Sequence, residues 1–293
     1  MYRFIAVLSL CICCCFGINT VYAGTSYTTG FETSEGYVVD ETLYQQNGWS
    51  GGDWTGDEWN KHNDAEKVTD SVAHSGTNSW YFPGGPTTEG PGTPFSPTLD
   101  VSVGAPDYAD YPIMNATIWF KPKNSNGDGS ALNIYQGATD GSDRTGFNVY
   151  IDSTQDGINV MTYTTDGWTD IATNLSLDQW HSIDIHAVFS NDIGSDQITY
   201  TIDKGTSGEI ASPVVNTWTH PWFLENQETY KPGDSLKFAW SRSAPDTAEG
   251  FYFDDISYEA VSAPPIPLPA TLPMILLGGV LSGGFGWMRR RRG

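Results

Sequence analysis

Turn-forming residues return every 8–12 positions along this chain, between stretches in which apolar and polar residues alternate. Alternation places successive side chains on opposite faces of a strand, and closely spaced turns favour antiparallel pairing. No stretch shows a sustained helical period. The pattern predicts an all-β antiparallel sandwich, with strands at 27–32, 66–70, 78–83, 115–122, 131–136, 146–152, 158–164, 180–189, 197–203, 235–241 and 250–258.

In three of these strands, apolar and polar side chains fall clearly on opposite faces. Residues 180–189, 146–152 and 197–203 each place isoleucine, valine, phenylalanine or tyrosine on one face and polar groups with some aromatic rings on the other. We expect the first face to form the core and the second to face solvent.

The N-terminus predicts a secretory signal peptide over residues 1–23. Arg3 is followed by an apolar run over 4–16, and Val21-Tyr22-Ala23 is a small-x-small cleavage site. An uncleaved anchor is the alternative, although the run is short for a span. All four cysteines lie inside this segment, so the exported body would hold no disulfide and no thiolate metal site.

The body is strongly acidic. The signal and the tail contain no acids but five of the 14 basic residues, so the body carries all 35 acids against nine bases, a net charge of about −26. This charge disfavours nucleic acid and anionic membranes as partners. It favours divalent cations and solubility in salt, and a solvated surface in a saline habitat explains it equally well.

The C-terminus has three parts. A linker and a proline-rich pentad occupy 261–271, with the pentad at Ile266, Pro267, Leu268, Pro269 and Ala270. Residues 272–288 lack charge and predict a transmembrane helix of roughly 25 Å. A basic stop over 289–293, with Arg289, Arg290, Arg291 and Arg292, would stay cytoplasmic by the positive-inside rule.

In this order, the three parts resemble the PEP-CTERM sorting signal in its VPLPA-type variant, with Ile266 in place of valine. The resemblance implies processing by an exosortase, a membrane cysteine protease-transpeptidase, in a Gram-negative bacterium that makes exopolysaccharide. A plain C-terminal anchor is one alternative. Leu268-Pro269-Ala270-Thr271 also resembles the LPxTG sortase signal, but Leu272 stands where that signal has glycine.

The body resembles the concanavalin A-like (laminin G-like) jelly roll. The resemblance is carried by QWHSIDIHAVFS, then ITYTIDKG, then a closing GFYFDDISYEA, and covers roughly 25–260. It implies one β-sandwich domain over 24–260, in which the last strand returns beside the first strand at TTGFET.

No catalytic motif is present in the sequence. Hydrolases of this fold carry Glu-x-Asp-x-Glu on one strand, because a retaining mechanism needs two carboxylates about 5 Å apart. The nearest alternatives here are Asp64-Ala65-Glu66 and the pair Asp255 and Glu259. The chain is therefore predicted not to be an enzyme.

Aromatic rings flanked by amides and carboxylates are typical of sugar-binding surfaces, because sugar C–H faces stack on rings and hydroxyls need paired donors and acceptors. The predicted strands offer such residues on their non-core faces, and we expect adjacent strands to align them as one trough: Trp119, Asn133, Tyr135, Asn148, Tyr150, Tyr163, Asp184 and His186. Second-layer packing beneath loops is the alternative.

Trp49, Trp54 and Trp59 recur at five-residue spacing in a Gly/Asp-rich segment. They could form a sugar platform or fill the edge of the sandwich; the second is favoured for Trp49, and the choice stays open for the other two.

Calcium is the predicted ion, since hard cations take carboxylate and carbonyl oxygens. If the first and last strands pair, Glu32 neighbours Asp254 and Asp255, where concanavalin-like folds often hold structural calcium. Looser candidates are Asn126, Asp128, Asp140 and Asp143, and hydrogen-bonded acids are the alternative.

Together these features predict an exported, non-catalytic protein of the cell surface or extracellular matrix. It would be held briefly in the inner membrane, processed by an exosortase, and associated with extracellular polysaccharide. The alternatives are a divergent polysaccharide hydrolase or lyase and a purely structural biofilm component.

Overall fold

A computed structural model describes residues 24–44, 46–51, 66–83, 94–95, 113–137, 147–164, 166–189, 196–216, 235–240, 244–245 and 247–261. All belong to one compact unit, Ala23–Ala263. The predicted signal peptide, pentad, transmembrane helix and basic stop lie outside the described residues, as do Trp54, Trp59, Asp140 and Asp143. Within the described part, no helix is long and apolar enough to cross a membrane.

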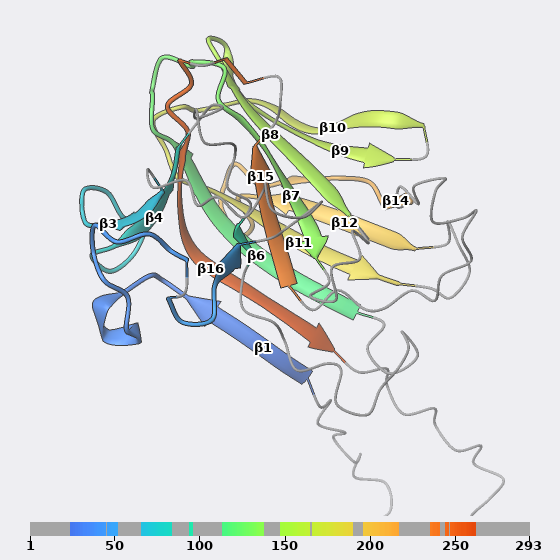
Figure 1. Ribbon diagram of the computed structural model, residues 1–293. Coiled ribbons are helices and arrows are strands. Elements are labelled where there is room, and N and C mark those ends of the chain that lie inside the picture. The colour runs from blue at the N-terminus through green and yellow to red at the C-terminus, as the bar shows by residue number, and fades with distance from the viewer. Residues whose placement is uncertain are drawn as a thin grey trace, which may run out of the picture. The chain divides into compact units, whose positions relative to one another are not determined.

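The described strands form two antiparallel sheets, which confirms the predicted all-β class (Figure 1). Sheet A has the order β13 (Ile210–Ala211), β12 (Gln197–Ile202), β11 (His181–Val188), β6 (Ile113–Pro122), β16 (Phe251–Val261), β4 (Ser79–Phe82) and β3 (Lys67–Thr69). In the same sheet β1 (Gly24–Thr29) pairs with β16, and β14 (Val215–Asn216) pairs with β12. A 3-10 turn, η1 (Thr33–Glu35), follows β1.

Sheet B has the order β10 (Gly167–Leu175), β9 (Gly157–Thr164), β8 (Asn148–Thr154), β7 (Ala131–Gly137), β15 (Ser235–Trp240), β5 (Pro94–Phe95) and β2 (Ser50–Gly51). β6 and β7 follow each other in the chain, yet they belong to different sheets. Consecutive strands that change sheet are what the predicted sandwich topology requires.

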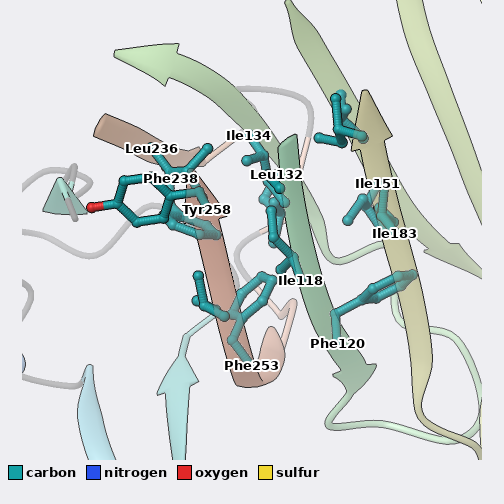
Figure 2. Close-up of a cluster of buried hydrophobic side chains, with 14 of the residues drawn as sticks. Ile118, Phe120, Leu132, Ile134, Ile151, Ile183, Leu236, Phe238, Phe253 and Tyr258 are labelled. Carbon is teal, nitrogen blue, oxygen red and sulfur yellow. The ribbon is translucent and has the colours of Figure 1, made fainter. Parts of the chain in front are cut away.

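The core lies between the inner faces of the two sheets (Figure 2). Period-two alternation is most regular in β6, where every second residue from Met114 is buried. Phe238 of sheet B lies 5.1 Å from Trp80 and 5.2 Å from Phe253 of sheet A, between ring centroids. A buried hydrogen bond between the hydroxyls of Thr162 and Tyr200 also links the sheets, at 2.9 Å. The predicted core faces are therefore confirmed.

The first and last strands pair as predicted. β1 and β16 are in register from Gly24 opposite Val261 to Thr29 opposite Ile256. β16 pairs with β6 on its other side, and that register shifts between Asp254 and Ser257. Asp255 at this irregularity has φ +43°, which turns its side chain out of the regular alternation.

Candidate functional site

The eight predicted glycan-binding residues lie on two sheets. Trp119 of β6 and Asp184 and His186 of β11 belong to sheet A. The other five belong to β7, β8 and β9 of sheet B: Asn133, Tyr135, Asn148, Tyr150 and Tyr163. Both groups face outward, with the core between them, so the expectation of a single trough is corrected. Alternation reveals which face a residue occupies but not which sheet its strand joins.

The sheet A group is already engaged with neighbouring side chains. The imidazole of His74 is stacked on Trp119, with 3.7 Å between centroids and 17° between planes. Thr117 donates its hydroxyl to Asp184 at 2.8 Å, and His186 Nδ1 lies 2.7 Å from Asn115 Oδ1. One ring face of Trp119 is thus covered, which disfavours this group as a stacking platform.

A shallow depression of about 310 Å³ lies farther along sheet A, over β1, β6 and β16. Asn115 and Glu259 meet there, since the amide donates to the carboxylate at 2.8 Å. Its two tyrosines pack into the core: Tyr258 is buried, and the partly buried Tyr27 lies 5.4 Å from it, between ring centroids. The depression therefore offers polar contacts without a stacking surface.

The outward face of sheet B gathers one exposed ring, Trp168, and two partly buried rings, Tyr150 and Tyr163. Register places Tyr150 beside Met161, and Met161 beside Asp170, across β8, β9 and β10. Tyr163 pairs with Trp168 one step along the same face. Trp168 lies 5.3 Å from Tyr150 and 5.1 Å from Tyr163, between ring centroids. We call Tyr150, Met161, Tyr163 and Trp168 the aromatic cluster.

Trp168 is the most exposed member of this cluster. Half of the surface of this residue is accessible, although tryptophan is usually well covered. Sequence reasoning missed it, because β10 was not among the predicted strands. The available signal was Asp166-Gly167, a hairpin turn pair directly after the predicted strand 158–164.

Polar groups flank the aromatic cluster. Asp152 pairs in register with Asn159, which lies two residues before Met161 on β9. Burial raises the pKa of Asp152, hydrogen bonds from Asn159 oppose that rise, and the nearby charge of Asp170 adds to it. Asn133 and Asn148, which we expected to face a ligand, are each less than a tenth exposed. Trp168 and Asp170 are therefore the exposed residues of this group, while Asp152 and the two tyrosines are partly buried.

The three predicted calcium ligands meet at one junction. Glu32, Asp254 and Asp255 surround Gly30, where an added Cβ would lie within 3.8 Å of all three. Their carboxylates accept hydrogen bonds from loop 74–78, which we call the anchored loop. Glu32 accepts from the backbone N–H groups of Thr77 and Asn78 at 2.8 and 3.0 Å and from the Thr77 hydroxyl.

The two aspartates bind the start of the anchored loop. Asp254 accepts from the backbone N–H groups of His74 and Ser75, at 2.8 and 3.1 Å, and from that of Asp255. Asp255 contacts the His74 ring nitrogen at 2.6 Å and the Ser75 hydroxyl at 2.8 Å. Burial and the charge of Asp255 raise the pKa of Asp254 to about 6, against the effect of its N–H donors.

This donor set does not fit a calcium ion, because each of the six carboxylate oxygens already has a hydrogen-bonding partner in the protein. Among the described residues, no group of three or more His, Cys, Asp or Glu side chains is arranged to hold a metal. Asp128, a looser candidate, also serves a loop: it accepts hydrogen bonds from Ser130, Ser153 and the backbone N–H of Glu249.

Trp49 fills the edge of the sandwich, which confirms the prediction for this residue. It is 2% exposed, and its indole N–H lies 2.9 Å from the hydroxyl of Tyr37 and 3.1 Å from that of Tyr27. Its ring packs 5.4 Å from Trp80, between centroids.

No protein-family model matches this chain, and no curated protein matches it. Solved structures that match this chain include "Cellulose induced protein, Cip1", at 16% identity and a TM-score of 0.43 over 79% of this chain and 96% of that one. Another is the CBM2 module of Lactobacillus casei BL23 phage J-1 evolved Dit, at 12% identity and 0.46 over 84% and 99%. Lectin II from Ulex europaeus matches at 12% identity and 0.40 over 81% and 98%. Similarities at this level assign no ligand or activity to this chain.

Proposed function

We propose that this chain is an exported, non-catalytic carbohydrate-binding protein, and that the aromatic cluster on the outward face of sheet B holds an extracellular polysaccharide. The observation that carries the proposal is the half-exposed Trp168, with Tyr150 and Tyr163 packed against it. Rings grouped on a polar face offer the C–H surfaces of a sugar a place to stack, while Asn159 and the exposed Asp170 supply partners for hydroxyl groups.

A glycan-array screen tests this proposal. The chain, expressed with its own signal peptide and purified, should bind a limited glycan class, and Trp168→Ala should weaken that binding at least tenfold. Trp119→Ala is the matched control, because it removes a tryptophan from sheet A, on the opposite side of the core. Equal loss in both variants, or none in Trp168→Ala, would place the binding surface elsewhere. Absence of any glycan binding would favour the structural biofilm component.

The same preparation separates binding from catalysis. A carbohydrate-binding protein leaves the length of its polysaccharide unchanged, whereas a hydrolase or lyase generates new chain ends. New reducing or unsaturated ends that disappear in Glu259→Gln or Asp255→Asn would establish the enzyme alternative.

We also propose that an exosortase processes the tail, on the strength of the pentad, the uncharged segment and the four arginines in that order. The protein would reside briefly in the inner membrane and then reach the cell surface, outer membrane or matrix of a Gram-negative bacterium. Deleting 266–293 should leave unprocessed protein that fails to localise. Normal maturation and localisation without the tail would refute the sorting proposal, independently of glycan binding.

A further inference from the structure

We infer that the aromatic cluster selects a glycan bearing protonated amino groups, such as a polymer of glucosamine, over a neutral or acidic one. This inference rests on the proposed function and specifies its ligand class. It is carried by one juxtaposition. Tyr150 and Tyr163 each contact Trp168, and the carboxylates of Asp152 and Asp170 lie on the same face of the same three strands.

The rings supply the first half of a cation site. Trp168 and Tyr163 meet edge to face, with 82° between their planes, and Tyr150 is tilted 57° to Trp168. Rings in different orientations cannot all stack on one flat sugar face, but they can direct their electron-rich faces toward a common small group. Ammonium groups bind to such faces through the ring quadrupole, and tryptophan is the strongest partner.

The two carboxylates supply the second half. Asp170 pairs with Met161, inside the aromatic cluster, and Asp152 is one register step away on β8. Burial raises the pKa of Asp152, and the charge of Asp170 adds to that rise. Asp170 is exposed, whereas one oxygen of the Asp152 carboxylate is covered. Like charges on neighbouring carboxylates repel each other, and a ligand ammonium bound at Asp170 would relieve that repulsion.

Within the described ranges, no exposed basic side chain lies on this face of sheet B. The described basic residue on the same outward face, Lys237 of β15, is 5% exposed and is separated from β9 by β7 and β8. The whole chain has a formal net charge of −21, which attracts polycations and repels polyanions such as uronic acid polymers. The acids beside the aromatic cluster and the net negative charge of the chain therefore both favour a ligand that carries positive charge.

Isothermal titration with two oligosaccharides of equal length tests the inference: a glucosamine oligomer and its fully N-acetylated counterpart, both at mildly acidic pH. We expect the purified protein to bind the amino oligomer about tenfold more tightly, with an advantage that shrinks as salt is added. Asp170→Asn should abolish most of that preference. Because Asp170 is exposed, this variant should fold normally, and circular dichroism would verify it.

Asp178→Asn is the matched control, since it removes one exposed negative charge from the turn before β11. If both variants lose affinity for the amino oligomer equally, the preference reflects net charge and the inference is wrong. If both oligomers bind equally and Trp168→Ala weakens both, the inference is wrong while the proposed function stands. If neither these oligomers nor any other glycan binds, both fail together.

Discussion

The imidazole of His74 lies flat on the indole of Trp119, with 3.7 Å between ring centroids, while its Nδ1 contacts the carboxylate of Asp255 at 2.6 Å. These two contacts of one imidazole join the anchored loop to β6 and β16. Because the stack covers one face of the indole, Trp119 contributes to holding the loop rather than to an open binding surface.

Replacing His74 with alanine should uncover Trp119 and loosen the anchored loop. We expect the free energy of unfolding to fall by about 1–2 kcal/mol, from the lost ring contact and the lost hydrogen bond. Urea titration followed by tryptophan fluorescence would measure both the loss and the new exposure of the indole. Glycan affinity should stay unchanged, and a large loss of affinity would mean that sheet A takes part in binding.

Glu32→Gln should weaken the other end of the anchored loop. Glutamine keeps the shape but loses the charge that strengthens three hydrogen bonds from Thr77 and Asn78, and we expect a cost of about 1–2 kcal/mol, moderated by partial exposure to solvent. Hydrogen exchange at the backbone amides of Thr77 and Asn78 should accelerate. Asp40→Asn is the control, because the Asp40 carboxylate forms an exposed ion pair with Lys67, which should contribute little.

Removal of calcium should leave the fold unchanged, since the carboxylates of Glu32, Asp254 and Asp255 are satisfied by protein donors. We expect the same melting temperature with added calcium and with chelator. Chelation could instead lower the melting temperature by several degrees in the original protein and not in Glu32→Gln. That result would establish calcium binding at the site predicted from the sequence.

Glu66 should make stability depend on pH in an unusual direction. It lies two residues before Val68, whose partner across the sheet is Trp80, so its side chain points into the core. It is 3% exposed, its Oε2 has no hydrogen-bond partner, and burial raises its pKa to about 8. The folded state therefore holds this proton up to about pH 8, whereas the unfolded chain releases it near pH 4.

Between those values the folded state binds more protons than the unfolded state, so the contribution of Glu66 to stability falls as pH rises and levels off above about pH 8. Glu66→Gln removes this dependence. Near pH 4 the variant and the original protein should differ little, and near pH 9 the variant should be more stable by about 2–5 kcal/mol. Urea midpoints at several pH values would measure the difference; a constant offset across the range would contradict the assignment.

The sequence predicted the strands whose alternation is regular, since burial of one face imposes period two on β6, β8, β11 and β12. It missed β10, where the register shifts between Asp170 and Ala172 and again before Leu175, so that the alternation breaks. Trp168 lies on β10, so it was not predicted as a site residue either.

The candidate site was predicted only in part, because its assembly depends on long-range pairing. Tyr150 and Tyr163 were expected on outward faces, but nothing local separates their sheet from that of Trp119. The carboxylates of Glu32 and Asp255 were expected together, as found, yet their role depends on loop N–H and hydroxyl groups up to 180 positions away in the chain. A pattern of acids alone cannot distinguish a metal site from a loop anchor.

The pairing of Gly24 with Val261 has a mechanical consequence. If the C-terminal tail holds the protein to a membrane while sheet B holds a polysaccharide, any pull between matrix and cell enters the fold through β16. That strand is bonded along its length to β6 on one side and to β1 and β4 on the other. Tension along it loads many hydrogen bonds in parallel rather than one after another, which is the arrangement that best resists being pulled apart.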